Sequence, residues 1–205
     1  MKILKVSPKK INLALKIAAK LIKQNKVLIF PTDTVYGLVG NAASWGAVGK
    51  LLKIKKRPKD KSLPVFIKNI KEAKKLAKIG KEQEKFLRKH WPGKVTVVLD
   101  RNKKVKIFGV ARETIALRIP DYRLLNLLLE KTELPIIGTS ANVSGKPDST
   151  KIKQIIKQFK NQKYQPDLII DVGNLKKSKT STVVDFTGAK IKILRKGAIK
   201  INEKS

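Results

Sequence analysis

The chain has 205 residues, no cysteine and one histidine, His90. This composition excludes thiolate catalysis, disulfide frameworks and Cys/His metal sites, so any metal would need oxygen ligands. A serine–histidine triad could use only His90, which has no serine or acidic residue beside it, and we interpret it as a residue at the entry to a turn.

The charge is the second large feature, because 48 Lys+Arg against 15 Asp+Glu give a net charge of +33. Such a field attracts polyanions, whether nucleotides, RNA or anionic lipid. The alternative is a compositional bias that covers solvated faces with lysine, since lysines occur throughout the chain. Arginine is scarce, which suggests that the retained arginines are needed for their planar guanidinium group.

The length allows one domain that buries about 70% of its unfolded surface. Residues 1–6 do not form the apolar stretch of an export signal, and no segment approaches the 20 or so apolar residues of a membrane span. We therefore predict a single domain over residues 1–205, located in the cytoplasm and not in a membrane.

The first third of the chain predicts alternating helices and strands. An amphipathic helix is expected over 8–23, a buried strand over 27–30, a helix over 43–54 and a strand over 63–67. Pro31 ends the strand 27–30, and residues 32–37 follow its carboxyl end, the usual place for a site in an α/β sheet.

The rest of the chain continues the α/β pattern. Helices are predicted over 70–77, 83–89, 122–130 and 151–159, the last capped by Ser149 or Thr150. Strands are predicted over 95–99, 114–119, 134–137, 168–171, 182–185 and 191–195. Because several closely spaced strands lack crossover helices, the predicted fold is a twisted, mixed parallel and antiparallel sheet with flanking helices.

No P-loop or Rossmann glycine motif occurs, so a bound nucleotide would be held by side-chain cations and hydroxyls. Lys55 and Arg57 stand two residues apart at a predicted helix end, and both could reach a triphosphate if the helix unwinds there. The alternative is a solvated basic cluster of Lys53, Lys55, Lys56 and Lys59.

A second candidate anion site is the loop that contains Ser140 and Asn142, between Gly138 and Gly145. Its alternative is a turn that only closes a strand–helix connection. Ser181 and Arg195 repeat the pattern of polar groups at strand ends, although each is a weak signal alone.

Taken in order, these segments resemble the YrdC-like family of L-threonylcarbamoyladenylate synthases, of the short single-domain type. The matching segments span nearly the whole chain and are 31–38 (PTDTVYGL), Lys55 and Arg57 with Pro58, 91–96 (WPGKVT), 116–120 (ALRIP), 140–147 (SANVSGKP), 181–185 (STVVD) and 193–197 (ILRKG).

The resemblance implies a basic cavity in which L-threonine, bicarbonate and ATP give threonylcarbamoyl-AMP and pyrophosphate. ATP is then a substrate, with Mg²⁺ bound to it and no metal ligands from the protein. Four residues would contact threonine, namely Thr34, Arg118, Gly138 and Ser181, with Arg118 as a bidentate partner of the carboxylate. Six would hold the nucleotide and its phosphates, namely Lys55, Arg57, Thr114, Ser140, Asn142 and Arg195.

The same resemblance implies a place in tRNA t6A37 modification, with a threonylcarbamoyl transferase complex as partner and tRNA as a further candidate partner.

Two residues depart from the family pattern. Phe66 stands where many relatives have a histidine, so one polar contact to threonine is absent or replaced. Asp148 stands where a serine is often found, and its carboxylate would repel phosphate unless a lysine or magnesium intervened.

Two other functions stay open. An RNA-binding factor of translation or ribosome maturation would use the positive charge, although two Trp, three Tyr and six Phe are few for base stacking. Removal of Arg118 would distinguish the two functions. In a synthase it should abolish threonine binding, whereas in an RNA-binding protein that uses its surface lysines it should leave RNA affinity nearly unchanged. Carbamoyl transfer in hydrogenase maturation is less favoured, since the accompanying zinc-finger and acylphosphatase segments are absent.

Overall fold

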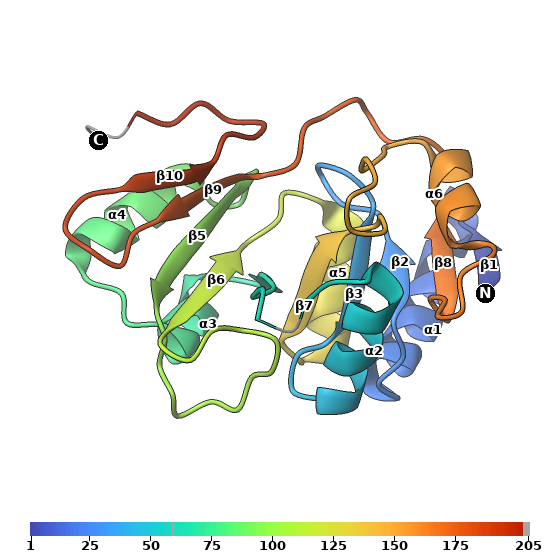
Figure 1. Cartoon of the computed structure of the whole chain (residues 1–205), viewed down its shortest axis with the longest axis horizontal. Helices are drawn as coiled ribbons and strands as arrows, with labels where there is room; N and C mark the ends of the chain where they lie inside the picture. The colour runs from blue at the N-terminus through green and yellow to red at the C-terminus, as the bar shows by residue number, and fades with distance from the viewer. Residues whose placement is uncertain (59, 203–205) are drawn as a thin grey trace.

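A computed structural model describes residues 1–58 and 60–202 of the chain. Its centre is one ten-stranded sheet in the order β1-β8-β2-β3-β7-β4-β6-β5-β9-β10 (Figure 1). The strands are β1 Lys2–Lys5, β2 Leu28–Phe30, β3 Gly37–Asn41, β4 Val65–Phe66, β5 Val95–Asp100, β6 Thr114–Arg118, β7 Ile136–Ser140, β8 Leu168–Asp171, β9 Thr182–Asp185 and β10 Lys192–Arg195.

The sheet is mixed, which confirms the predicted fold class. Four neighbouring pairs in the described residues are parallel, namely β1/β8, β8/β2, β4/β6 and β5/β9. The other pairs are antiparallel and include β3 on β7 and β7 on β4. The middle of the sheet therefore joins segments that lie far apart in the sequence.

Helices cover both faces of the sheet (Figure 1). They are α1 Ile11–Lys23, preceded by the 3-10 turn Pro8–Lys10, α2 Trp45–Lys55, α3 Ile70–Leu76, α4 Lys81–His90, α5 Arg123–Thr132 and α6 Ile152–Phe159. Helices α1 and α5 pack against each other on one face, whereas α2 and α6 lie on the other. No helix of the described residues is long and apolar enough to cross a membrane.

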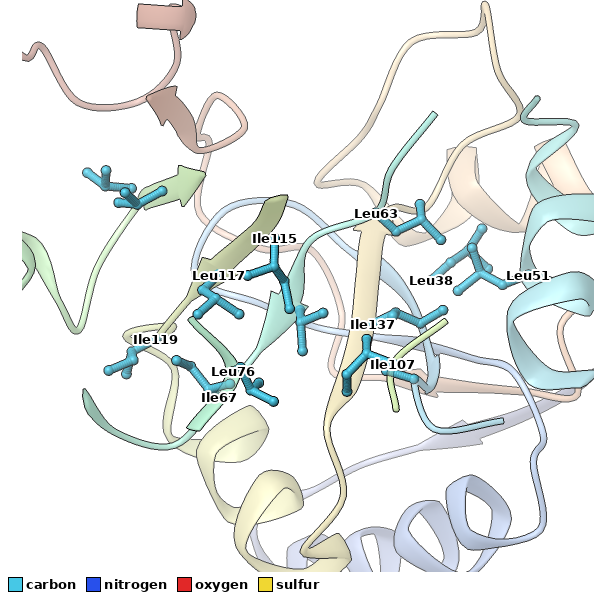
Figure 2. Packing of buried hydrophobic residues seen from close by; sticks show 14 of the residues in the cluster. Leu38, Leu51, Leu63, Ile67, Leu76, Ile107, Ile115, Leu117, Ile119 and Ile137 are labelled. Atoms are coloured by element: carbon cyan, nitrogen blue, oxygen red, sulfur yellow. The ribbon is translucent and has the colours of Figure 1, made fainter. Parts of the chain in front are cut away.

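Strict alternation along the strands separates two hydrophobic clusters. In β2, Leu28 and Phe30 face the cluster under α1 and α5, whereas Ile29 faces the larger cluster under α2. Figure 2 shows part of the larger cluster, in which Leu38 of β3 and Leu51 of α2 point toward each other. Both faces of the strands are thus buried at this end of the sheet.

At the other end of the sheet the same alternation leaves one face polar. In β6, Ile115 and Leu117 enter the larger cluster (Figure 2), whereas Ala116 and Arg118 point to the opposite face. In β5, Thr96 lies on that opposite face between buried valines. Helices α1 and α5 do not cover this region, and it becomes the wall of a cavity.

Two strands were not predicted from the sequence. β1 is a mostly exposed edge strand, so it lacks the apolar signal of a buried strand. β3 contains two glycines, which are poor strand formers, and its strand conformation is imposed by pairing with both β2 and β7. The predicted helix over 8–23 begins as a 3-10 turn, and the strand predicted over 63–67 shortens to β4.

Candidate functional site

A cavity of about 260 Å³ opens on the polar face of β4, β5, β6, β7 and β9. The turn after β2 and the segment before β4 complete its wall. Seven of the ten predicted site residues line it, namely Thr34, Arg57, Arg118, Gly138, Ser140, Ser181 and Arg195. These residues come from positions 34 to 195, so the fold brings together motifs that are distant in the sequence.

The turn after β2 is held by its own hydroxyl groups. Thr32 Oγ1 donates to the carbonyl of Val35 at 2.7 Å and accepts from the backbone N–H of Thr34 at 3.1 Å. The Oγ1 atoms of Thr32 and Thr34 share a further hydrogen bond of 3.0 Å. Thr34 is thereby fixed at the cavity wall with a buried hydroxyl.

Arg118 is neutralised by a carboxylate of the same turn. Its Nη2 lies 2.6 Å from both carboxylate oxygens of Asp33, and the two side chains are only 4% and 5% exposed. Its Nε donates to the carbonyl of Gly93 at 2.8 Å. Burial lowers the pKa of Arg118, and Asp33 opposes that shift. Asp33 thus occupies Nη2, and Nη1 lies 3.5 Å from Thr34 Oγ1 at the cavity wall.

Lys55 is the last residue of α2 and is also buried, but it has no carboxylate partner in the described residues. Its Nζ donates to the carbonyl of Ser140 at 2.7 Å and to the carbonyl and Oδ1 of Asn142 at 3.1 and 2.8 Å. Burial, together with the positive charges of Arg57 and Arg195, lowers the pKa of Lys55 to about 8, although Asp148 opposes the shift. Lys55 therefore braces the 140–142 loop from behind the cavity wall.

Arg57 and Arg195 add two further cations without ion pairs in the described part of the chain. The helix ends at Lys55, and Lys56 adopts a left-handed conformation with φ 53°, so Arg57 leaves α2 toward the cavity. Arg57 Nη2 donates to the carbonyl of Ser62 at 2.9 Å. Arg195 Nη2 donates to the carbonyl of Ser181 at 2.8 Å. Both guanidinium groups are oriented by neutral oxygens and keep their full charge.

Ser181, in turn, is fixed by a residue that the sequence analysis did not single out. Its Oγ shares a hydrogen bond of 2.8 Å with Thr96 Oγ1, and both hydroxyls are buried. Thr96 is the polar residue between two buried valines of β5, and this alternation was the signal that could have identified it. Asp33 was also missed, because its partner Arg118 is 85 positions away.

Gly138 and Phe66 form one unit at the floor of the cavity. They lie on the neighbouring strands β7 and β4, and a Cβ on Gly138 would overlap the Phe66 ring. Glycine at 138 is therefore what allows phenylalanine at 66 to lie flat against β7. The departure at Phe66 is thus accommodated sterically, and it places an apolar ring where a histidine would supply a polar group.

The remaining predicted residues lie outside the cavity lining. Asn142 is behind Ser140, where its Oδ1 accepts from Ser140 Oγ at 2.6 Å. Thr114 shares the face of β6 with Arg118 but lies at the far end of the strand, opposite Asp100. Asp148 is exposed, and it lies close enough to Lys55 to oppose the lowering of the lysine pKa.

The structure also bears on two alternatives from the sequence, the solvated basic cluster around Lys55 and a catalytic role for His90. Lys55 is buried, whereas Lys53 and Lys56 are exposed, so the proposed solvated basic cluster does not include Lys55. Lys59 lies outside the described residues. His90 ends α4 and packs on the ring of Phe86 with centroids 4.4 Å apart, and it does not line the cavity.

The arrangement can attract an anion, since three cations lie close together and two exposed carboxylates, Asp60 and Asp148, oppose them only in part. No group of three His, Cys, Asp or Glu residues within 1–58 and 60–202 could hold a metal ion. The fold and this cavity together define an α/β protein whose candidate anion site is built from side chains, with no glycine-rich phosphate loop in its sequence.

The comparisons identify the family. The Sua5/YciO/YrdC family, described as "Telomere recombination", matches residues 20–197. The threonylcarbamoyl-AMP synthase of Pyrococcus abyssi is 35% identical over 92% of this chain and 55% of its own length. The threonylcarbamoyl-AMP synthase of Bacillus subtilis is 40% identical over 67% of this chain and 41% of its own length. The chain therefore spans about half the length of these two relatives.

Solved structures agree with this assignment. P. abyssi Sua5 complexed with L-threonine superposes with a TM-score of 0.84 at 34% identity, covering 96% of this chain and 57% of that one. Escherichia coli YciO, at 23% identity, shows the same fold with a TM-score of 0.82 and covers 96% of this chain and 94% of its own. The chain belongs to the Sua5/YciO/YrdC family, which confirms the resemblance read from its motifs.

Proposed function

We propose that this protein is an L-threonylcarbamoyladenylate synthase. In this reaction the amine of L-threonine takes up bicarbonate with loss of water, and a carbamate oxygen then attacks the α-phosphorus of ATP. Pyrophosphate leaves, and threonylcarbamoyl-AMP is the product. The observation that carries the proposal is a cavity lined by Arg57 and Arg195, with Lys55 behind its wall, and by the hydroxyls of Thr34, Ser140 and Ser181. None of these three cations has an ion-pair partner in the described residues.

The three cations would stabilise the polyphosphate. Charge on the phosphate oxygens grows and shifts toward pyrophosphate as the α-phosphorus is attacked, and fixed positive groups lower the energy of that state. Lys55 and Arg195 are held in place by Ser140, Asn142 and Ser181 before any ligand arrives. This orientation reduces the reorganisation that binding would otherwise require.

The hydroxyl-lined side of the cavity would hold threonine. Thr34 and Ser181 present buried oxygens, and Gly138 with Phe66 forms an apolar floor suited to the methyl group of threonine. Arg118 would contribute one N–H, from Nη1, to the carboxylate. No residue at the cavity is required as a general base for the attack, because the carbamate already carries the nucleophilic oxygen.

ATP would bring Mg²⁺ with it as a substrate complex, since the cavity wall offers cations in place of carboxylate ligands. Because the product is a reactive mixed anhydride, we further propose transfer to a threonylcarbamoyl transferase complex that modifies tRNA. The names of the relatives support the synthase reaction that precedes this transfer.

The proposal is tested by pyrophosphate release from ATP by the purified protein, with bicarbonate and magnesium. Release is expected with L-threonine and not without it, and L-serine should be a much poorer substrate. Pyrophosphate release that does not depend on threonine would overturn the proposal. The matched variants are Arg195→Gln and Lys192→Gln, which both remove a cation from β10, and only the first faces the cavity. We expect Arg195→Gln to lower the rate by on the order of a hundredfold and Lys192→Gln to leave it unchanged.

A further inference from the structure

A second hollow, of about 690 Å³, lies beside α2 on the outer surface of the molecule. We call it the α2 groove, defined by Trp45, Gly49, Lys53, Lys56, Arg57 and Tyr164. It lies between α2 and the segment that follows α6, and these elements lie next to each other on one side of the sheet (Figure 1). Arg57 belongs to both the groove and the cavity, so the two hollows adjoin.

Exposed aromatic rings gather in this groove. Trp45 is 56% exposed and Tyr164 is 41% exposed, and they are the two aromatic residues among the exposed large hydrophobic residues that the structure describes. Phe108 supports the indole of Trp45 from the edge, with ring centroids 5.8 Å apart. Aromatic residues are few in this chain, so the placement of both exposed rings in one groove is informative.

Ammonium groups lie close to the Tyr164 ring and to the Phe108 ring that supports Trp45. Lys53 Nζ lies 5.4 Å and Lys163 Nζ 5.9 Å from the centre of the Tyr164 ring, and Lys106 Nζ lies 5.5 Å from the centre of Phe108. None of these lysines forms an ion pair with a described residue. A planar ring beside an unpaired cation is the combination that binds a base together with its phosphate.

Two glycines of α2 keep the floor of the groove open. Glycine within a helix destabilises it by roughly 0.5–1 kcal/mol relative to alanine, so a packing reason is normally expected. A Cβ on Gly49 would meet nothing within 4 Å, and a Cβ on Gly46 would meet only Ser44 Oγ at 3.8 Å. Packing therefore does not require glycine at either position, and both glycines line the groove without a side chain that would project into it.

We propose that the α2 groove binds single-stranded RNA, with bases stacked on Trp45 and Tyr164 and phosphates contacted by Lys53 and Lys56. The rings favour RNA over an acidic peptide, because carboxylates would use the lysines but leave the rings without partners. They favour single strands over duplex, because paired bases cannot stack on a side chain. The inference goes beyond the proposed function and does not depend on the synthase chemistry.

The first experiment measures the binding of a labelled single-stranded RNA of about 15 nucleotides by fluorescence anisotropy at fixed salt. Trp45→Ala and Tyr164→Ala should each weaken binding on the order of tenfold, because a stacked base is lost. Lys53→Gln should weaken binding and lower the slope of log affinity against log salt by about 0.7. Lys16→Gln removes an equivalent charge from the exposed face of α1 and should leave affinity unchanged.

A second readout keeps the test independent of folding and of catalysis. Gly49→Leu should fill the groove and weaken RNA binding, and every variant should retain threonine-dependent pyrophosphate release. RNA should also quench the fluorescence of exposed Trp45, since the other tryptophan, Trp91, is buried. Wild-type affinity in both aromatic variants would overturn the proposal. So would equal affinity for a glutamate homopolymer that depends on the same two rings, because the groove would then bind an acidic protein.

Discussion

Two sides of the same cavity handle positive charge in opposite ways. On the Arg118 side, the guanidinium and Asp33 neutralise each other, and both are almost fully buried. On the Lys55 side, Lys55, Arg57 and Arg195 are held only by neutral oxygens within the described residues. The ion pair on the first side has no net charge, whereas the cations on the second side leave a positive charge that can attract a ligand.

The two sides therefore differ in what their charges are expected to do, since one pair holds the fold and the other cations are available to a ligand. A buried ion pair contributes little net stability but is strongly destabilised when one partner is removed. A buried cation without a counter-charge destabilises the folded protein and strengthens binding of an anion. The Arg118 side should therefore respond to mutation mainly in stability, and the Lys55 side mainly in activity.

The largest expected effect is on stability and comes from Asp33→Ala. The substitution leaves Arg118 charged and buried without a partner, so the free energy of unfolding should fall by about 3–5 kcal/mol in urea denaturation. The control is Asp121→Ala, which removes an exposed carboxylate three residues after Arg118. It should change the free energy of unfolding by less than about 0.5 kcal/mol. A loss below about 1 kcal/mol for Asp33→Ala would show that the ion pair does not anchor this side.

Lys55→Met tests the other side. Pyrophosphate release should fall by on the order of 10²–10³-fold, as expected for loss of a fixed transition-state charge. Stability should change far less than in Asp33→Ala, because relief of roughly 3 kcal/mol of burial cost offsets the unpaired oxygens of Ser140 and Asn142. Lys53→Met, on the exposed face of the same helix, is the control. The comparison would be wrong if Lys55→Met lost as much stability as Asp33→Ala but its folded fraction kept the wild-type specific activity.

The pH dependence of ATP affinity should follow Lys55. Its pKa is lowered from 10.5 to about 8, so the free protein loses this charge above about pH 8 and ATP binding should weaken. The unfolded chain keeps the proton up to about 10.5, so Lys55 contributes a stability that rises with pH between these values. Calorimetric titration of ATP at several pH values should show the weakening in the wild type and not in Lys55→Met.

The smallest effect is expected from Asp148→Asn. This exposed carboxylate partly opposes the cations of the Lys55 side. Its removal should strengthen ATP binding about two- to fivefold at low salt and have no effect at about 1 M salt, where the Debye length is near 3 Å. Glu130→Gln, on the exposed face of α5, should not change affinity. A weaker affinity in Asp148→Asn would instead indicate that the carboxylate helps to hold the magnesium of ATP.

The motifs predicted much of the site, because each one is a short polar segment beside a strand. Residues such as Thr34, Arg57, Ser181 and Arg195 line the cavity for this reason. Long-range partners were not predicted, and Asp33 is the clearest case. Nothing local to its segment indicates that it would meet Arg118, and this contact changes what Arg118 can offer a ligand.

The sequence by itself determined the family, the α/β class and the alternation of β5 and β6, because these depend on local order and on a period of two. Only the tertiary structure decided that β3 is a strand, which cations are neutralised and which exposed rings share a groove. The physical reason is the same in all three cases. Pairing, burial and charge compensation depend on neighbours in space, and here those neighbours come from distant parts of the chain.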